Sequence, residues 1–324
     1  MSSPAALRFP YSRILLPRTR LAYIHLRNLL TDAKRDRAAR ISGYVAVSLL
    51  DELAIFYLVK GEVANATIHD GRGSRAIAIA NALEKVPTEP EYGEICFHEA
   101  DLEQLACMFA SQTTPAEPWP EGMHAQDPGA LFPYLVSITF DGVVEIIANE
   151  NVNYLIFRNG IVARAFLTSL HHGTIVDRVK KLFAREGRVG GLRVTRRGVP
   201  GSLPLQAPPA LVQAYRDLTT TLVQRLVENG RDSAPAIAEH ARQTLLATHP
   251  VLDGFSLSGR PGKEPLEDTA GLTAGVAAWI REVMWAAVDH DAVAPDALLK
   301  ELCWDRRHMF QSAGLFDQIP WKVI

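Results

Sequence analysis

The segment His69–Ser74 is the first place to look for chemistry, because it combines a histidine, an acid, an arginine, two glycines and a serine. Serine is a preferred N-cap, and a helical spacing of apolar residues follows over residues 75–85. Free N–H groups at a helix start can bind a phosphate or a carboxylate. The sequence therefore predicts an anion-binding turn made by Arg72, Gly73, Ser74 and Arg75. The spacing matches neither a P-loop nor GxGxxG, so an ordinary capped turn is the alternative.

Residue types that ligate metals occur in three other places, His171–His172, Asp289–Asp291 and Cys303–His308. Adjacent side chains diverge, and none of these places has the ligand spacing of a known metal site. We expect a polar loop at the two histidines and structural or surface roles in the other two places. No metal site is predicted.

Catalytic motifs are absent from the sequence: it contains no GxSxG, HExxH or kinase pattern. We therefore expect a noncatalytic protein without a cofactor. A basic stretch over residues 164–197 lacks the interleaved aromatic residues and the helix-turn-helix pattern of nucleic-acid binders. No nucleic-acid partner is expected. The basic residues of the helix predicted there, Arg178, Lys181 and Arg185, are interpreted as an interface for an acidic protein partner.

The composition favours a folded protein of a reducing compartment. With 324 residues and 48% hydrophobic content, the chain can fill the cores of two or three domains. Its three cysteines form no CxxC pair, which argues against a disulfide framework and for the cytoplasm. The N-terminus lacks the apolar segment of a leader peptide, and no run approaches the roughly 18 apolar residues that span a bilayer. Neither export nor membrane insertion is expected.

Charge is distributed in blocks along the chain. Residues 1–40 and 158–197 are basic, whereas residues 41–157 and 198–324 are acidic. Opposite fields steer association, so these blocks suit contacts between modules or between subunits of a homo-oligomer. Clustered solvated surface charge is the alternative.

An internal duplication organises the elements that must position these groups. Residues 42–66 and 141–165 align without a gap at an offset of 99 residues. Each copy reads as a strand, a polar break, a second strand and a glycine turn. The matched turn and strand-start residues are Gly43 with Gly142 and Gly61 with Gly160, which follows Asn159. An Asn-Gly pair between apolar runs is the strongest short hairpin signal, because both turn positions favour φ > 0.

Each copy is predicted to be a module of the order α-β-β-β-α-β. The first module covers residues 1–111 and begins with an extended arm over residues 1–19. A helix over 101–111, capped by Asp101, could lead the second module, and a proline-rich loop over 112–130 follows it. The second module covers residues 131–198. Its first strand is expected over 135–140, and its second helix over 175–185.

A linker over residues 198–209 precedes a mostly α-helical C-terminal domain, residues 207–324. Apolar stripes predict helices that start near residues 211, 234, 272 and 295, and a short strand is expected over 251–257. The apolar chain end is expected to dock. The stripe over 272–287 is interpreted as core, whereas Trp285 lies beside it and is a predicted interface anchor.

The duplicated unit resembles the PATAN domains first described at the N-termini of bacterial response regulators. The likeness lies in the paired leucines 29 and 30, the strand-opening Gly43, the Gly61 turn with the small residues after it, and the alanine-rich helix that follows. It covers residues 20–100 well and 135–197 more loosely. No receiver domain is recognisable, and nothing after residue 200 is included.

This resemblance implies a noncatalytic bacterial regulatory module that binds other proteins in signalling linked to motility or surface behaviour. We therefore predict an α+β fold with two PATAN-like modules and a helical domain, acting as a cytoplasmic scaffold or adaptor. A second hypothesis is a sensor that binds a small anionic ligand, such as a nucleotide or cyclic dinucleotide, at the Gly71–Arg75 turn.

Overall fold

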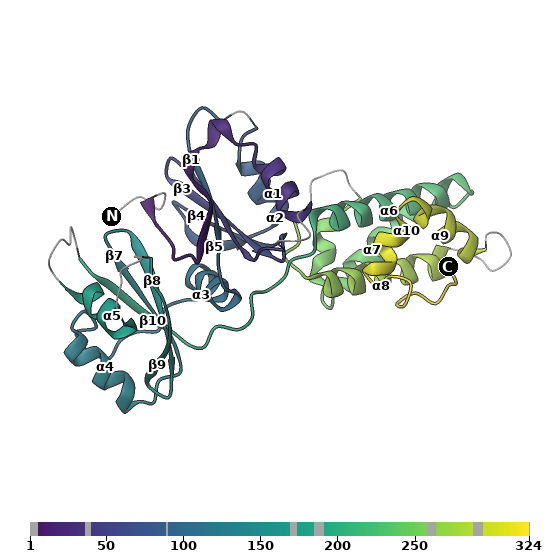
Figure 1. Cartoon of the computed structure of the whole chain (residues 1–324). Helices are drawn as coiled ribbons and strands as arrows, with labels where there is room; N and C mark the ends of the chain where they lie inside the picture. Colours follow the sequence, from purple (N-terminus) through teal and green to yellow (C-terminus); the bar gives the residue numbers. More distant parts are fainter. Residues whose placement is uncertain are drawn as a thin grey trace. The chain divides into compact units, whose positions relative to one another are not determined.

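The computed structural model of the chain describes residues 6–35, 40–88, 90–168, 174–184, 191–257, 264–287 and 294–323. These residues form two compact units (Figure 1). The first unit contains residues up to 77 together with residues 82–204, and the second contains residues 78–81 and 205–324. The fold class is α+β as predicted, with two antiparallel sheets in the first unit and helices in the second.

The two sheets of the first unit share a common strand order. The larger sheet has the order β1-β6-β2-β3-β4-β5, and the smaller has the order β10-β7-β8-β9. The larger sheet contains β1 (Arg13–Arg20), β2 (Gly43–Leu49), β3 (Glu52–Val59), β4 (Glu62–Asp70), β5 (Gly73–Ile77) and β6 (Glu94–Glu99). The smaller contains β7 (Gly142–Ala148), β8 (Asn151–Arg158), β9 (Ile161–Phe166) and β10 (Arg193–Arg197). The order β6-β2-β3-β4 of the first module is thus repeated as β10-β7-β8-β9 in the second.

The duplication extends to strand register, with every equivalent position 99 residues apart. Gly43 lies opposite Leu58 in the first module, and Gly142 lies opposite Phe157 in the second. The pairing of the second with the third strand shifts register at the same step, between Tyr57 and Leu58 in one copy and between Ile156 and Phe157 in the other. The closing strands obey the same offset, since Tyr44 pairs with His98 and Val143 with Arg197. The prediction that the two hairpins share one strand topology is confirmed.

The predicted glycine turns are confirmed, and packing explains why glycine is needed. Lys60 and Gly61 have φ of 53° and 83°, and Asn159 and Gly160 have φ of 50° and 76°, as a primed hairpin turn requires. A Cβ on Gly160 would also lie 2.6 Å from the Cα of Val136. The glycine turns therefore give room to the helix that leads each module, α1 (Leu26–Arg35) and α4 (Pro128–Ser137).

The strand-opening glycines serve a different purpose, which is close approach to the neighbouring strand. A Cβ on Gly43 would lie 2.1 Å from the carbonyl oxygen of His98, and one on Gly142 would lie 2.3 Å from that of Arg197. Any side chain at either position would push the closing strand away from the sheet.

Each module also carries a second helix, α2 (Ile79–Lys85) or α5 (Ile175–Phe183). In the second module, α4 and α5 bury one face of the sheet, with Leu131, Leu135, Val179 and Phe183 packing on Val144, Ile146, Leu155 and Phe157. Helix α5 begins with a capping box between Thr174 and Asp177. These two helices cover one face of the smaller sheet, and its other face packs against a different part of the first unit.

Four local predictions are wrong. Helix α4 occupies residues that were predicted to be a strand over 135–140 and the end of the loop over 112–130. This helix, rather than the helix after Asp101, leads the second module. Pro128 starts α4 at a position where proline suits a helix, and the Asp127 side chain accepts a hydrogen bond from the Gly129 N–H at 2.9 Å. Residues 75–77, the predicted start of the helix over 75–85, belong to strand β5, and the helix α2 begins only at Ile79. Residues 250–255 form a 3-10 helix, η3 (Pro250–Phe255), rather than a strand.

The fourth error concerns the last predicted helix, because residues 295–311 are divided into three elements. These are α9 (Pro295–Cys303), η4 (Trp304–Arg306) and α10 (Arg307–Ser312). Leu299, Cys303 and Phe310 are all buried, so the apolar pattern continues across the break and cannot reveal it. The arm expected over residues 1–19 forms strand β1 from residue 13 onward, at an edge of the larger sheet, and the short 3-10 helix η2 (Leu21–Tyr23) follows that strand.

The second unit is a helical cluster built around α6 (Pro209–Glu228), α7 (Ala234–Leu245) and α8 (Thr269–Ala287). Helix α6 ends in a Schellman motif: Gly230 has φ of 83°, and the N–H of Arg231 donates to the Leu226 carbonyl at 3.0 Å. The predicted docking of the chain end is confirmed, since Leu315, Ile319 and Val323 are buried in this core. None of the helices in the described ranges is long and apolar enough to cross a membrane.

Candidate functional site

Helix α3 (Leu102–Thr113) lies between equivalent faces of the two sheets. Tyr57 from the first sheet and its counterpart Ile156 from the second belong to one buried cluster, together with Leu105 and Met108 of α3. The Asp101 side chain caps the helix, as predicted, by accepting a hydrogen bond from the Glu103 N–H at 2.8 Å. The helix thus fills the space that the two modules leave between them.

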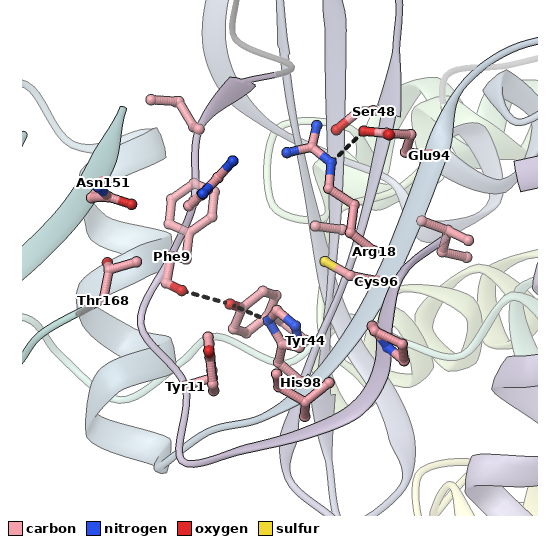
Figure 2. A pocket seen from close by; sticks show the side chains of 16 residues that line it. Phe9, Tyr11, Arg18, Tyr44, Ser48, Glu94, Cys96, His98, Asn151 and Thr168 are labelled. Atoms are coloured by element: carbon pink, nitrogen blue, oxygen red, sulfur yellow. Dashed lines mark hydrogen bonds and ion pairs between the residues drawn. The ribbon is translucent and has the colours of Figure 1, made fainter. Parts of the chain in front are cut away.

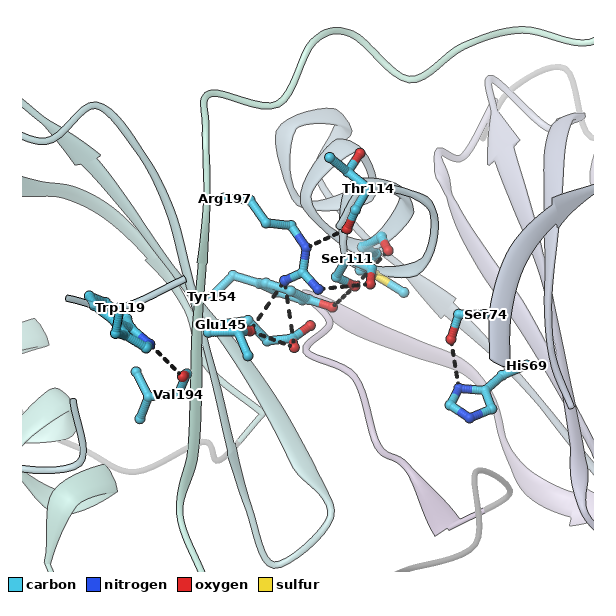
Figure 3. A network of polar contacts seen from close by, with 11 residues as sticks. His69, Ser74, Ser111, Thr114, Trp119, Glu145, Tyr154, Val194 and Arg197 are labelled. Atoms are coloured by element: carbon cyan, nitrogen blue, oxygen red, sulfur yellow. Dashed lines mark hydrogen bonds and ion pairs between the residues drawn. The ribbon is translucent and has the colours of Figure 1, made fainter. Parts of the chain in front are cut away.

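Two arginines hold the ends of α3 against the second sheet. Arg164 on β9 pairs with Asp101 at 3.2 Å and with Glu103 at 2.5 Å. Arg197 on β10 donates to the carbonyl oxygens of Thr114 at 3.0 Å and Ser111 at 3.2 Å (Figure 3). Anionic groups therefore lie at the helix start and a cation at its end, which is the favourable arrangement for the helix dipole.

The Arg197 end of this clamp is buried and densely hydrogen-bonded. The side chains of Arg197 and Glu145 are 3.7 Å apart and almost inaccessible. The Thr195 hydroxyl donates to Glu145 at 3.1 Å, and the hydroxyls of Tyr154 and Ser111 are 3.0 Å apart. The two charged side chains of this cluster, Arg197 and Glu145, both have partners inside the protein. The cluster is therefore suited to joining the modules rather than to binding a ligand.

The equivalent place on the first module is hollow. A cavity of about 540 Å³ opens there, between the floor formed by β2 and β6 and a wall formed by the arm and β1 (Figure 2). Asn151 and Thr168 of the second module line its far side. This volume falls in the range of small-molecule sites.

Divergence between the two copies accounts for the cavity. The second module has Glu145, Ile147, Thr195 and Arg197 at the positions 99 residues after Ala46, Ser48, Cys96 and His98. All four first-module residues line the cavity. All four are smaller than their counterparts, and His98 takes the place of the clamping arginine. The larger side chains of the second module fill its sheet face, whereas the smaller side chains of the first module leave space for the cavity.

His98 is the polar group at the centre of this cavity lining. Its Nδ1 lies 2.8 Å from the hydroxyl of Tyr44, which is also 3.0 Å from the Phe9 carbonyl oxygen and 3.2 Å from that of Pro10. The hydroxyl has a single proton and carbonyls only accept, so the Tyr44 proton goes to a carbonyl. His98 Nδ1 must then carry the other proton and donate to Tyr44. The lone pair on Nε2 remains available as an acceptor.

Burial keeps His98 neutral and the neighbouring thiol protonated. Desolvation lowers the pKa of His98 from 6.5 to about 4. Desolvation also raises the pKa of the Cys96 thiol to about 11 and that of Tyr44 above its ordinary value. At neutral pH the His98, Cys96 and Tyr44 side chains of the floor therefore carry no charge, and Cys96 is not a reactive thiolate.

Charge enters only at the rim of the cavity. Arg18 forms an ion pair with Glu94, so it is neutralised locally. Arg8 is exposed and lines the same cavity. Among the described residues, no carboxylate forms an ion pair with its guanidinium. Its backbone is fixed by the second module, because its N–H donates to the Glu150 carbonyl at 3.0 Å.

The turn predicted to bind an anion is not a helix start. Gly73, Ser74 and Arg75 lie on β5, in a hairpin with β4, and Ser74 is therefore no N-cap. Asp70 accepts hydrogen bonds from the Arg72 N–H at 2.9 Å and from Arg75 at 2.7 and 2.8 Å. These hydrogen bonds, that of the Arg75 side chain first, hold the pKa of Asp70 well below its usual range. The protein's own carboxylate thus occupies the predicted anion position.

The predicted interface residues are dispersed over both units. Lys181 is exposed on α5 and Arg178 is half-buried there, whereas Arg185 lies outside the described residues. His171, His172 and residues 289–291 lie outside them as well. Trp285 on α8 is 61% exposed, and the stripe beside it is buried as predicted. Within the described parts of the chain, no group of three His, Cys, Asp or Glu side chains could hold a metal ion.

The cavity itself was missed by reasoning from the sequence. Strand alternation places Ala46, Ser48, Cys96 and His98 on one face of the sheet. A position-by-position comparison of the two copies would have shown that this face is lined by smaller residues in the first module than in the second. The contribution of the N-terminal arm, however, has no counterpart in the duplicated pattern.

Comparisons with known proteins identify no relative. No family model, no curated protein and no solved structure matches the chain. The likeness to PATAN domains therefore rests on the residue pattern alone.

Proposed function

We propose that this chain is a noncatalytic adaptor of the bacterial cytoplasm, similar to PATAN-domain proteins, that binds protein partners in a signalling or motility-related pathway. The observation that carries the proposal is the exposure of Trp285. Its ring centroid lies 6.1 Å from that of Trp321 in the docked chain end, and its own helix is otherwise packed into the core. An exposed tryptophan that packs beside a half-buried one on a rigid support is typical of a binding hot spot.

The rest of the molecule supports a binding role over a catalytic one. The cysteines described at positions 96, 107 and 303 all have a pKa raised by burial, to about 11, 12 and 12, so none is an activated nucleophile. The polar cluster at Arg197 is saturated by internal hydrogen bonds. The partner, or a second copy of the chain, would dock on the surface that contains Trp285.

The test compares Trp285→Ala with the wild-type protein. We expect the variant to keep its circular dichroism spectrum and to weaken self-association in analytical ultracentrifugation, or binding to a purified partner identified by pull-down, by at least tenfold. Trp304→Ala is the matched control, because Trp304 is equally exposed but contacts Arg307 rather than another tryptophan. Equal effects of both substitutions, or none from Trp285→Ala, would contradict the proposal.

A further inference from the structure

The cavity of the first module is preformed, and neither Trp285 nor Trp321 of the proposed adaptor surface lines it. Its floor is the small-residue face of β2 and β6, and its wall is the arm that runs from Leu7 to Arg18. The arm is held in place at both ends: β1 pairs with β6, and Arg8 forms a bridge with Asn151. Such a cavity is held open by secondary structure and needs no ligand to order it.

The polar groups of the cavity define what it can recognise. Among the described residues none is recorded as a partner of His98 Nε2, so this atom can accept a hydrogen bond from a bound molecule. Tyr11 packs on the imidazole, with ring centroids 4.5 Å apart, and Phe9 packs on Tyr44. Aromatic walls of this kind favour a flat apolar ligand. Arg8 at the rim, which has no ion-pair partner among the residues that the structure describes, adds a preference for an acidic group.

We propose that this cavity binds a small aromatic acid whose ring lies against the arm, whose O–H or N–H group donates to His98 Nε2, and whose carboxylate faces Arg8. The ligand binds noncovalently. This site is separate from the Trp285 surface and gives the proposed adaptor a second binding site, for a small molecule. In the described part of the second module, Glu145, Ile147 and Arg197 occupy the equivalent sheet face, where the first module has the cavity.

The donor requirement is tested with a matched pair of probes on the full chain. We expect 6-hydroxy-2-naphthoate to bind with a saturable 1:1 isotherm in titration calorimetry and about 5- to 10-fold more tightly than 6-methoxy-2-naphthoate, which lacks the donor. In a long-range proton–nitrogen NMR spectrum, the Nε2 resonance of His98 should shift on addition of the hydroxyl probe. Absence of saturable binding, or equal affinities of the two probes, overturns the proposal.

Two substitutions test the location. Ser48→Ile introduces the residue that the second module carries at the equivalent position and fills the floor, so binding should fall at least tenfold. Arg8→Gln, at an exposed side chain, should weaken binding several-fold without changing the melting temperature. Trp285→Ala should leave binding unchanged, which separates this site from the adaptor surface. Wild-type affinity in a folded Ser48→Ile protein, together with wild-type affinity in Arg8→Gln, overturns the proposal.

Discussion

Glycine is required for two separable reasons among the residues of the first unit. Gly160 combines a left-handed φ of 76° with a Cβ position 2.6 Å from backbone, whereas Gly73 has φ of 96° and open space around it. Gly160→Ala should therefore cost about 2–3 kcal/mol of unfolding free energy, and Gly73→Ala about 1 kcal/mol. Urea denaturation measures both. Gly71, which has neither constraint, is the control, and equal losses at Gly160 and Gly71 would contradict the turn assignment.

His98 should titrate far below an ordinary histidine. Its pKa of about 4 in the folded protein lies below the 6.5 of the unfolded chain, because burial disfavours the charged ring. The unfolded chain therefore binds the extra proton first, so His98 lowers stability as the pH falls from 6.5 towards 4 and has no further effect below 4. Nitrogen-15 NMR should show an Nδ1–H tautomer at pH 7. An Nε2–H tautomer would refute the hydrogen-bond assignment to Tyr44.

At the scale of elements, α3 depends on one buried ion pair more than on its exposed ones. Arg197→Met leaves Glu145 buried without its cation and removes two bonds to the carbonyls of α3. We expect a loss of about 3–5 kcal/mol in the unfolding free energy of the first unit, as for other broken buried pairs. Chemical denaturation and the hydrogen exchange of α3 amides measure it.

The opposite end of α3 supplies the control. Arg164 and its acidic partners are one-third to one-half exposed, so Arg164→Met should cost less than about 1 kcal/mol. The double variant Glu145→Leu, Arg197→Met removes both charges and should be more stable than Arg197→Met alone. Similar losses at both ends of the helix would show that burial does not decide the strength of this clamp.

At the scale of the whole molecule, the two modules should not fold separately, because α3 and residues of both sheets share one buried cluster. A protease site inserted between Glu121 and Gly122, both exposed, allows the chain to be cut between modules. The cut protein should remain one species in size-exclusion chromatography with an unchanged circular dichroism spectrum. After separation in denaturant, the N-terminal fragment should not refold alone. A native spectrum from that fragment would contradict the shared core.

The sequence by itself determined the duplication, its hairpin turns and the positions of most helices. These features depend on local rules: Asn-Gly favours φ > 0, Asp101 caps the next helix, and apolar residues repeat with the period of a strand or a helix. The same local rules misassigned residues 75–77 as helix, because their side chains fit either pattern and pairing with β4 decided between them. They also missed α4, whose start lies in a proline-rich segment.

Only the tertiary structure decided that the equivalent sheet faces of the two modules have different surroundings. Offsets of 99 residues link Arg197 to His98 and Glu145 to Ala46, but no local pattern places α3 in the buried cluster that both sheets share. No local pattern places the N-terminal arm over β2 and β6 either, because both contacts are non-local. The N-terminal arm then closes the remaining space around His98 and Tyr44. The cavity thus arises because the arm and β1 form a wall over a sheet face that carries smaller residues in the first module than in the second.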